Sequence, residues 1–299
     1  MKLLKVAAVA LVPLLAGIAG VAHADENLFG YLKGAEPMPQ GGRSAYLHMT
    51  RRSDKGAGHY EALDAAAEYE YGLTDRLTGA LYLKGLAIDT HGLRIDGYLP
   101  KDEEYGLRLS GVEGSLKYTF LSPALDDFGL ATYLSYSHSW LDPHSGQDKQ
   151  KDTVELKLLL QKYYLDGQLI WVGNVGMEST MAQRGEINDL PAGFEWPTDP
   201  EMELGFNAGT GLSYRFAPGW FAGGELFYDE EHETDVGLER WSLQAGPSIH
   251  YGGQRWWTTL TYLPQLRGGG ERYAGQQETD LHLIEKTKRE LRLKIGYNF

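Results

Sequence analysis

The sequence has no cysteine among its 299 residues. It therefore cannot form a disulfide, a thiolate metal site or a cysteine nucleophile. It also has no basic excess. The formal net charge is −13, and removing Lys2 and Lys5 makes it −13 − 2 = −15. A chain this acidic is a poor match for nucleic acid, so we expect no nucleic-acid partner.

Long apolar runs are scarce as well. After residue 24 no stretch approaches the roughly 18 consecutive apolar residues that a transmembrane helix needs. The first 24 residues are different: a basic start, an apolar stretch over 6–21, and the small-x-small sequence Ala22-His23-Ala24. This pattern predicts a secretory signal peptide over 1–24, with a retained helical anchor as the alternative. The mature chain would then begin at Asp25.

Strict alternation of apolar and polar residues is the most abundant pattern in the sequence. Between residues 202 and 216, Leu204 and Phe206 alternate with Glu203 and Asn207, and the whole stretch keeps this rhythm. Successive side chains of a strand point to opposite faces, so the pattern predicts strands with one oily and one polar face. The chain ends in the same rhythm, as LKIGYNF.

Twelve such runs occur, at roughly 43–51, 59–72, 77–86, 105–120, 129–141, 152–165, 169–179, 201–216, 220–230, 239–251, 255–264 and 286–299. Several gaps between them are tight turns, and others are long, at 87–104, 142–151, 180–200 and 265–285. An even strand number with short periplasmic turns and long outside loops is typical of bacterial outer-membrane barrels. We predict an all-β fold: a closed antiparallel transmembrane β-barrel of about 12 strands in up-and-down order over 43–299. A soluble β-sandwich is the alternative.

Aromatic residues end the runs nearest the short turns. We expect these six to form an aromatic girdle at the inner membrane interface: Tyr71, Phe120, Tyr164, Phe216, Tyr251 and Phe299. A sandwich would not explain their common position. The apolar ending at Phe299 resembles the C-terminal signal read by the outer-membrane barrel assembly machinery. We therefore expect that machinery, outer-membrane lipid and lipopolysaccharide as partners.

Six stretches carry a resemblance to a known family: ENLFGYLKGAE (26–36), EYGLTDRLTG (70–79), LSPALDDFGLA (121–131), LDPHSG (141–146), EWPTDPEMEL (195–204) and LIEKTKRELRLK (283–294). They resemble an uncharacterised family of proteobacterial, porin-like outer-membrane barrels, known only as a domain of unknown function. The resemblance spans nearly the whole mature chain. It implies the barrel fold and localisation in the Gram-negative cell outer membrane, but no activity.

The polar face of the strands predicts the lumen lining: Glu68, Glu70, Glu113, Lys117, Glu155, Lys157, Glu203, Arg215, Glu225, Glu290, Arg292 and Lys294. A barrel of about twelve strands is intermediate between filled eight-stranded barrels and wide porins, so we expect a narrow pore or a lined pocket. Two interpretations stay open: the charges brace the barrel by pairing across it, or they select a solute. Arg215, Arg292 and Lys294 would attract an anion unless Glu203 and Glu225 neutralise them.

The leading functional prediction is a porin-like channel for a small polar or charged solute, with no enzyme activity, cofactor, metal ligand or catalytic residue expected. The alternatives are an outer-membrane hydrolase of protease or phospholipase type, and a structural or adhesive barrel. The hydrolase rests on Asp89-Thr90-His91 and Asp142-Pro143-His144-Ser145, which place acid, imidazole and hydroxyl together. No Gly-x-Ser-x-Gly nucleophile elbow accompanies them.

Three other stretches give expectations about the loops and the lumen. The acidic residues 229–235 predict an outside turn, either a solvated tip that bridges lipopolysaccharide through cations or a site for a hard divalent cation. Residues 25–42 precede the first run and would lie in the periplasm or plug the barrel. Gly268-Gly269-Gly270 predicts a flexible outside loop. Of the remaining residues, His48, His138 and His250 are expected in the girdle or the lumen rather than as ligands.

Overall fold

The structure is a computed structural model that describes residues 27–95, 101–188, 190, 196–233 and 237–299. These residues form twelve strands and no helix: β1 Arg43–Ser53, β2 Ala57–Gly72, β3 Leu77–Arg94, β4 Glu104–Leu121, β5 Gly129–Leu141, β6 Asp148–Tyr164, β7 Leu169–Arg184, β8 Glu201–Ala217, β9 Trp220–Glu233, β10 Gly237–Gly252, β11 Trp256–Gly270 and β12 Arg289–Asn298. None of the described segments is a helix able to cross a bilayer. The signal peptide predicted over 1–24 lies outside the described residues.

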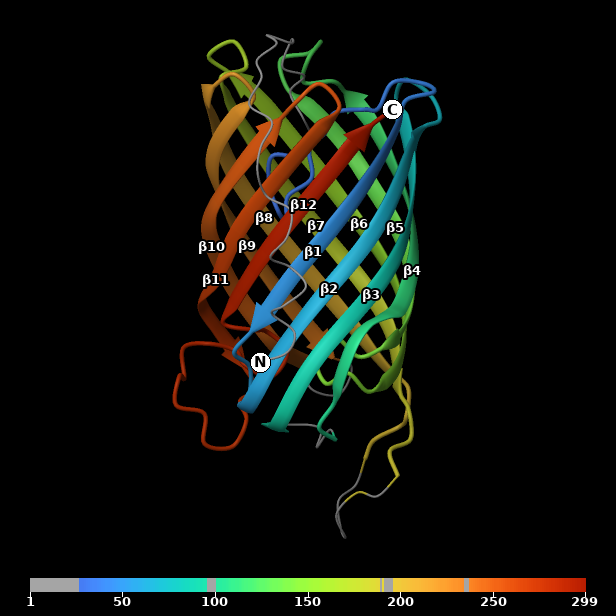
Figure 1. Cartoon of the computed structure of the whole chain (residues 1–299), viewed down its shortest axis with the longest axis vertical. Helices are drawn as coiled ribbons and strands as arrows, with labels where there is room; N and C mark the ends of the chain where they lie inside the picture. The colour runs from blue at the N-terminus through green and yellow to red at the C-terminus, as the bar shows by residue number, and fades with distance from the viewer. Residues whose placement is uncertain (1–26, 96–100, 189, 191–195, 234–236) are drawn as a thin grey trace.

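The strands close into one antiparallel barrel, in which each strand pairs with its sequence neighbours (Figure 1). Closure comes from β1 and β12, which pair from Ser44 opposite Asn298 to Ser53 opposite Arg289. The predicted closed, up-and-down, twelve-stranded barrel is therefore confirmed. Closure leaves no strand with an unpaired edge, which is what a sheet surrounded by hydrocarbon requires.

Several strands are longer than the sequence pattern predicts. β3 continues to Arg94 rather than ending near residue 86, because its outer part pairs with β2, Thr90 opposite Tyr60. β11 likewise includes Gly268 to Gly270, where Gly268 pairs with Ser242. The prediction of a flexible glycine loop there was wrong. A partner strand extends the ladder beyond the apolar alternation, and a single run of residues does not reveal that partner.

The alternation becomes the two faces of the barrel. In β8, Leu204, Phe206 and Leu212 are exposed on the outside, whereas Glu203 and Ser213 are buried inside. The outer face of the other strands is similarly rich in exposed Leu, Val, Tyr and Phe. An outer surface of this kind suits contact with lipid chains, and the polar inner face suits a lumen.

The two rims differ, although less than predicted, because β3 and β6 extend into the long loops expected at 87–104 and 142–151. The connections 73–76, 122–128, 165–168, 218–219 and 253–255 lie at the rim that also holds the C-terminus, at the top of Figure 1. The opposite rim carries the long β11–β12 connection, residues 271–288, drawn in red. One connection at that rim, 54–56, is short. We call the first rim the inner rim and the second the outer rim.

The six predicted girdle residues all lie at the inner rim, at or next to the ends of the even-numbered strands, with exposed side chains. Other aromatic rings extend the band. Trp220 lies against Tyr251, with ring centroids 4.9 Å apart, and Trp256 lies against Tyr297 at 4.6 Å. Aromatic rings with a polar edge are typical of the level where hydrocarbon meets headgroups.

A charge placed on the outer face tests the assignment of the two faces. Leu158 faces outward from β6, whereas Leu165 is exposed in the β6–β7 turn. We expect Leu158→Arg to lower the free energy of unfolding by about 2–4 kcal/mol, and Leu165→Arg to change it by less than about 1 kcal/mol. Urea unfolding of the barrel in phospholipid vesicles measures both. Equal losses for the two variants would contradict a lipid-facing Leu158.

Candidate functional site: the lumen

The segment before β1 lies inside the barrel. Residues 27–40 run through the inner half of the lumen and leave it at the inner rim, where Gly41 N–H donates to the Gly72 carbonyl at 2.8 Å (Figure 1, dark blue). Leu28, Phe29 and Leu32 are buried, and they pack with inward-facing Ile170, Val172 and Phe221. Of the two placements predicted for residues 25–42, the structure places the described part in the lumen.

Wall side chains bind the backbone of this segment. The Glu225 carboxylate accepts from Gly30 N–H at 2.8 Å and from Tyr31 N–H at 2.9 Å. Asn174 binds both sides of Lys33: its Oδ1 accepts from Lys33 N–H at 2.8 Å, and its Nδ2 donates to the Lys33 carbonyl at 2.9 Å. An amide side chain used in this way replaces the partner that a neighbouring strand would supply.

The pattern continues toward the inner rim. Gln161 Oε1 accepts from Ala35 N–H at 2.7 Å, and Thr119 Oγ1 donates to the Ala35 carbonyl at 3.0 Å. Met38 N–H then donates to Thr78 Oγ1 at 3.2 Å. These contacts come from β3, β4 and β6, so the segment is held from several sides of the barrel without joining the sheet.

The predicted lumen charges occupy the inner face. Seven of them are buried, namely Glu68, Glu70, Lys117, Glu203, Glu225, Glu290 and Lys294, and five are half-buried, namely Glu113, Glu155, Lys157, Arg215 and Arg292. Some pair within the wall. Lys157 lies 2.6 Å from Glu155, and Glu113 lies 2.6 Å from Lys84. Pairing of this kind compensates the cost of removing charges from bulk water.

Arg215, Arg292 and Lys294 do not form the predicted basic cluster, and Glu203 and Glu225 do not neutralise it. β8, which carries Arg215, is separated from β12 by three strands in the closed order. The β12 cations bind the lumen segment instead. Arg292 donates to the Gly30 carbonyl at 3.0 Å and lies over the Tyr31 ring, and Lys294 donates to Asn27 Oδ1 at 2.7 Å.

The two carboxylates expected to neutralise that cluster also have other partners. Glu225 binds the segment, and Glu203 lies 3.3 Å from Lys149 and 2.9 Å from Lys151 in the outer half. Tyr31 donates its hydroxyl to Glu290. The lumen segment therefore takes the place that an anion was expected to fill beside Arg292 and Lys294.

A second insertion occupies part of the outer half. The connection 271–288 folds into the mouth, where His282, Leu283 and Ile284 are buried. Gln265 fixes it by accepting from His282 N–H at 2.7 Å and donating to the His282 carbonyl at 2.9 Å. Ile284 belongs to an apolar cluster with inward-facing side chains of β2, β3 and β4, namely Tyr60, Ala62, Leu86, Ile88 and Tyr105.

Ion pairs around Arg240 join this connection to the wall. The Arg240 guanidinium donates to Asp229 at 2.7 Å, to Glu231 at 2.6 Å and to Glu285 at 2.6 Å. Lys286 adds a contact of 2.6 Å to Asp229. Although burial raises the pKa of Glu285, the combined attraction of Arg240, His144, Lys151 and Lys149 outweighs it and holds that pKa well below its usual range.

The acidic stretch 229–235 is not the solvated tip predicted from composition. Residues 229–233 belong to β9, with Asp229 and Glu231 buried on the inner face, and 234–236 lie outside the described residues. The prediction was wrong because these carboxylates pair with Arg240 across the β9–β10 ladder. A register shift between Leu238 and Arg240 also brings Glu239 near Glu231 and Glu285, whose oxygens lie within 4.8 Å of one another. Arg240 already neutralises two of these three carboxylates.

The residues that suggested a hydrolase lie in two separate places. His91 is exposed on the outside, 3.0 Å from Asp89 and stacked on His59. His144 is half-buried, with its Nδ1 2.6 Å from Lys55 Nζ, while Ser145 Oγ donates to Asp142 at 2.6 Å. Burial first, and then Lys55, lower the pKa of His144 well below its usual value. In the described part of the chain, the hydrogen bonds give neither histidine a serine partner.

The three strand histidines predicted for the girdle or the lumen lie in different contacts. His48 is half-buried and lies 2.6 Å from Glu68, and His250 is buried 2.7 Å from Thr259. His138 lies 2.9 Å from Asp152 toward the outer rim. The first two face the lumen, because Glu68 and Thr259 are inward-facing residues of neighbouring strands.

Little space remains between the segment and the wall. A cavity of about 40 Å³ lies among residues of β1 to β5, β12 and the segment, including Lys33, His48, Glu68, Lys117 and Lys294. That volume suits water molecules rather than a passing solute, since a water occupies about 30 Å³ in the liquid. Residues 27–40 thus occupy the inner half of the lumen, and part of the connection 271–288 occupies its outer mouth.

Comparisons with known proteins agree with this architecture. A family model described as Family of unknown function (DUF6662) matches residues 21–299. The chain belongs to this family. No curated protein matches the sequence. Among solved structures, the COG4313 outer membrane channel from Pseudomonas putida F1 has a TM-score of 0.60 at 13% identity, covering 89% of this chain and 98% of that chain.

A second similar structure is the beta domain of the Bordetella autotransporter BrkA. Its TM-score is 0.52 at 13% identity, covering 87% of this chain and 100% of that chain. At these identities the likeness concerns the fold alone. The fold of this family member is that of an outer-membrane β-barrel.

Loss of the Glu225 charge tests how the segment is held. We expect Glu225→Gln to loosen residues 27–40, because hydrogen bonds to a charged group contribute about 1.5–3 kcal/mol. The chain has no native cysteine, so a cysteine placed at Lys33 reports exposure cleanly. Labelling by a polar thiol reagent should speed up by about tenfold or more.

Glu203→Gln is the matched control for this variant. Glu203 is equally buried but pairs with Lys149 and Lys151 in the outer half. It should leave the labelling rate at position 33 unchanged. If Glu225→Gln labels no faster than the unsubstituted barrel, Glu225 does not hold the segment.

Acid should release the outer connection. Burial lowers the pKa of His282 to about 4; nearby Arg240 and Lys55 also lower it, while Glu285 opposes them. A released His282 would titrate near its ordinary value of about 6.5, so the docked form binds fewer protons. Docking is therefore fully stable above about pH 6.5 and weakens as the pH falls toward 4, by about 2 kcal/mol at pH 5.

A spin label on a cysteine at exposed Ala274 would report this release as increased mobility between pH 7 and pH 5. His282→Gln removes the titrating group and should reduce the change. His144, whose pKa burial also lowers, acts in the same direction, so some pH dependence should remain. An unchanged pH response in His282→Gln would assign it to other groups.

Proposed function

We propose that this protein is an outer-membrane channel for small polar or charged solutes, held closed by residues 27–40 in the inner half and by the connection 271–288 at the outer mouth. The observation that carries this proposal is the way residues 27–40 fill the lumen. They are bound by wall side chains, and no strand depends on them for its ladder. The filling is therefore separable from the barrel.

Removal of the segment would leave a wall that water can solvate. The groups it releases are mainly hydrogen-bonding side chains, including Glu225, Asn174, Gln161, Arg292 and Lys294. Burial without partners would be costly for such groups, but exposure to water is not. An open lumen lined in this way is consistent with passage of a polar solute rather than an apolar one.

The width of the barrel also supports a channel. Side chains fill a barrel of eight strands, whereas sixteen or more leave a wide aqueous passage. Twelve strands lie between these limits, and here whole chain segments fill the space that side chains leave. The likeness in fold to a solved outer membrane channel points in the same direction.

The hydrolase alternative gains no support from the contacts. Ser145 Oγ is bound to Asp142, and His144 lies against Lys55, so the groups needed for nucleophilic attack are not arranged as nucleophile and base. A structural or adhesive barrel is the remaining alternative. It would keep its lumen closed under all conditions and would pass no current.

Conductance in planar bilayers tests the channel. Because the two closures lie in series, we expect the full-length barrel to pass little current, and the deletions of 27–40 and of 272–287 to have small effects singly. The double deletion should give stable single-channel steps. Deletion of 124–127, in an exposed turn at the inner rim, is the control and should leave the current as in the full-length barrel.

Folding of each variant is checked by its heat-dependent migration on gels and by its β circular dichroism. A folded double-deletion barrel without conductance would overturn the proposal and leave the structural or adhesive role. Conductance of the full-length barrel equal to that of the double deletion would show that the two insertions do not close the lumen.

A further inference from the structure

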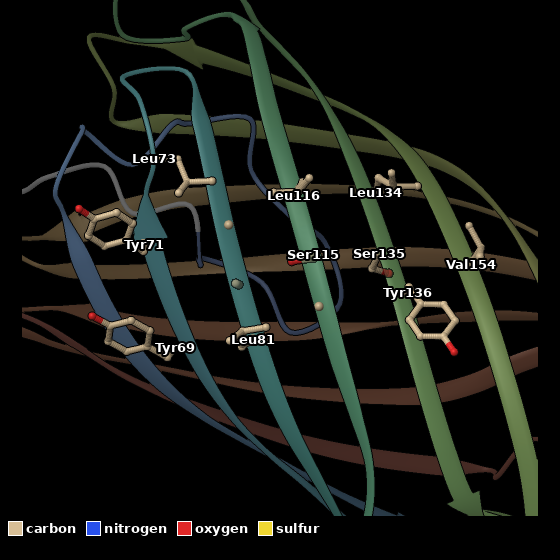
Figure 2. A pocket seen from close by; sticks show the side chains of 13 residues that line it. Tyr69, Tyr71, Leu73, Leu81, Ser115, Leu116, Leu134, Ser135, Tyr136 and Val154 are labelled. Atoms are coloured by element: carbon tan, nitrogen blue, oxygen red, sulfur yellow. The ribbon is translucent and has the colours of Figure 1, made fainter.

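The outer face of the barrel carries an apolar groove near the inner rim. Figure 2 shows it across β2 to β6. Its volume is about 660 Å³, within the range of roughly 300–1,000 Å³ that is usual for small-molecule sites. We call it the outer groove. Tyr69, Tyr71, Leu73, Leu81 and Tyr136 form much of its wall.

Two cross-strand rows of outward-facing residues make the outer groove. In the first row Tyr71 pairs with Gly79, which pairs with Leu116. In the second row Leu81 pairs with Gly114, which pairs with Tyr136. Each row thus has one glycine, which has no side chain, between residues with large side chains. The two glycines are diagonal neighbours on β3 and β4, so the gaps join into a continuous slot.

The glycines are not needed for the backbone. Neither Gly79 nor Gly114 has a left-handed backbone conformation, and a Cβ built on Gly114 would meet the nearest atom, in Leu81, at 3.7 Å. That is an ordinary contact distance. A side chain would be tolerated at position 114, and glycine there has the effect of leaving the slot open.

A cation lies at the inner-rim end of the outer groove. Arg43 of β1 is directly opposite Tyr71 in the register, is exposed, and places its guanidinium 5.9 Å from the Tyr71 ring. Phe299 N–H donates to the Arg43 carbonyl, so Arg43 lies within the girdle, at the level where lipid headgroups lie. A planar guanidinium is suited to bind a phosphate through two parallel hydrogen bonds.

We propose that the outer groove binds one glycerophospholipid of the periplasmic leaflet, with an acyl chain in the slot between Gly79 and Gly114 and the phosphate on Arg43. The inference rests on placement of the barrel in the outer membrane and is independent of lumen opening. Lipid tails are as apolar as the groove, so binding would depend on close packing against the aromatic walls and on the phosphate contact.

Charge complementarity favours a phospholipid over a second copy of the chain. The protein carries a formal charge of −13, which disfavours an anionic headgroup except beside a local cation such as Arg43. A two-fold dimer would place the same patch of both copies together. It would therefore bring groove against groove with Arg43 on both sides, and two copies of the same negative net charge repel each other.

Native mass spectrometry of the full-length, delipidated barrel tests the proposal, with dioleoyl phosphatidylglycerol as probe and dioleoylglycerol as the analogue without phosphate. We expect one phosphatidylglycerol per barrel to be retained and the analogue to bind at least about tenfold more weakly. Gly114→Leu fills the slot, and Arg43→Gln removes the phosphate contact. Each should weaken retention by about tenfold or more.

Two matched controls accompany these variants. Ala208→Leu adds three of the four carbons on the outward face of β8, away from the groove, and Lys162→Gln removes a cation placed 5.7 Å from the girdle residue Tyr164. Both should retain the lipid. Arg43→Gln leaves all apolar packing in place, so it remains informative if Gly114→Leu folds poorly.

Three results would overturn the proposal. They are equal retention by all variants, no retained lipid in the unsubstituted barrel, and a dimer that forms without lipid and is lost in Gly114→Leu. The last would assign the outer groove to contact between copies. Normal lipid retention would support this inference whether or not the barrel conducts.

Discussion

Closure of the backbone hydrogen-bond ladder is the constraint on which the rest of the structure depends. In hydrocarbon an unpaired N–H or C=O costs several kcal/mol, so a sheet with open edges has no stable place there. The pairing of β1 with β12 removes those edges. It also fixes the face of every side chain, because a shift of one residue in register would turn the oily face inward and the charged face outward.

The same closure buries polar and charged wall side chains, and these need hydrogen-bond or ion-pair partners. Neighbouring wall charges supply some of these partners, as Lys84 does for Glu113. Segments outside the sheet supply more of them, since Glu225 gains two backbone N–H groups from residues 30 and 31. The bracing and solute-binding interpretations of the lumen charges therefore concern the same wall side chains. The groups that brace the closed state are those that an open state would present to water.

Periodic features could be predicted from the sequence, whereas contacts between distant segments could not. Alternation in β8 and the aromatic at each inner-rim end follow from local pattern alone, so the closed barrel was predictable. Leu159 and Ile170 face the lumen although they are apolar. Their stretches, LLL and LIWV, break the alternation, but which face each residue takes depends on the segment that fills the lumen.

Charge composition was the least reliable guide. Residues 229–233 have the composition of a solvated loop, yet they form a strand, because Arg240 on the next strand neutralises Asp229 and Glu231. Glu225 offers a similar lesson. Its partners are the backbone N–H groups of Gly30 and Tyr31, 195 and 194 residues away, and a backbone donor leaves no mark on the sequence. Only the alternation of glycine with bulky residues in β3 and β4 signalled the outer groove.

The two closures differ in chemistry, and this difference determines how they would be opened. Residues 27–40 are held by amides, hydroxyls, the carboxylates Glu225 and Glu290 and the cations Arg292 and Lys294, whereas the connection 271–288 is held by ion pairs on Arg240 and a buried neutral imidazole. Acid acts on the outer closure through His282. The two closures share one wall residue, because Glu290 accepts a hydrogen bond from Tyr31 of the inner closure and another, at 3.4 Å, from Thr287 of the outer one. Groups with a common partner are energetically coupled, so release of either segment should change the free energy of releasing the other.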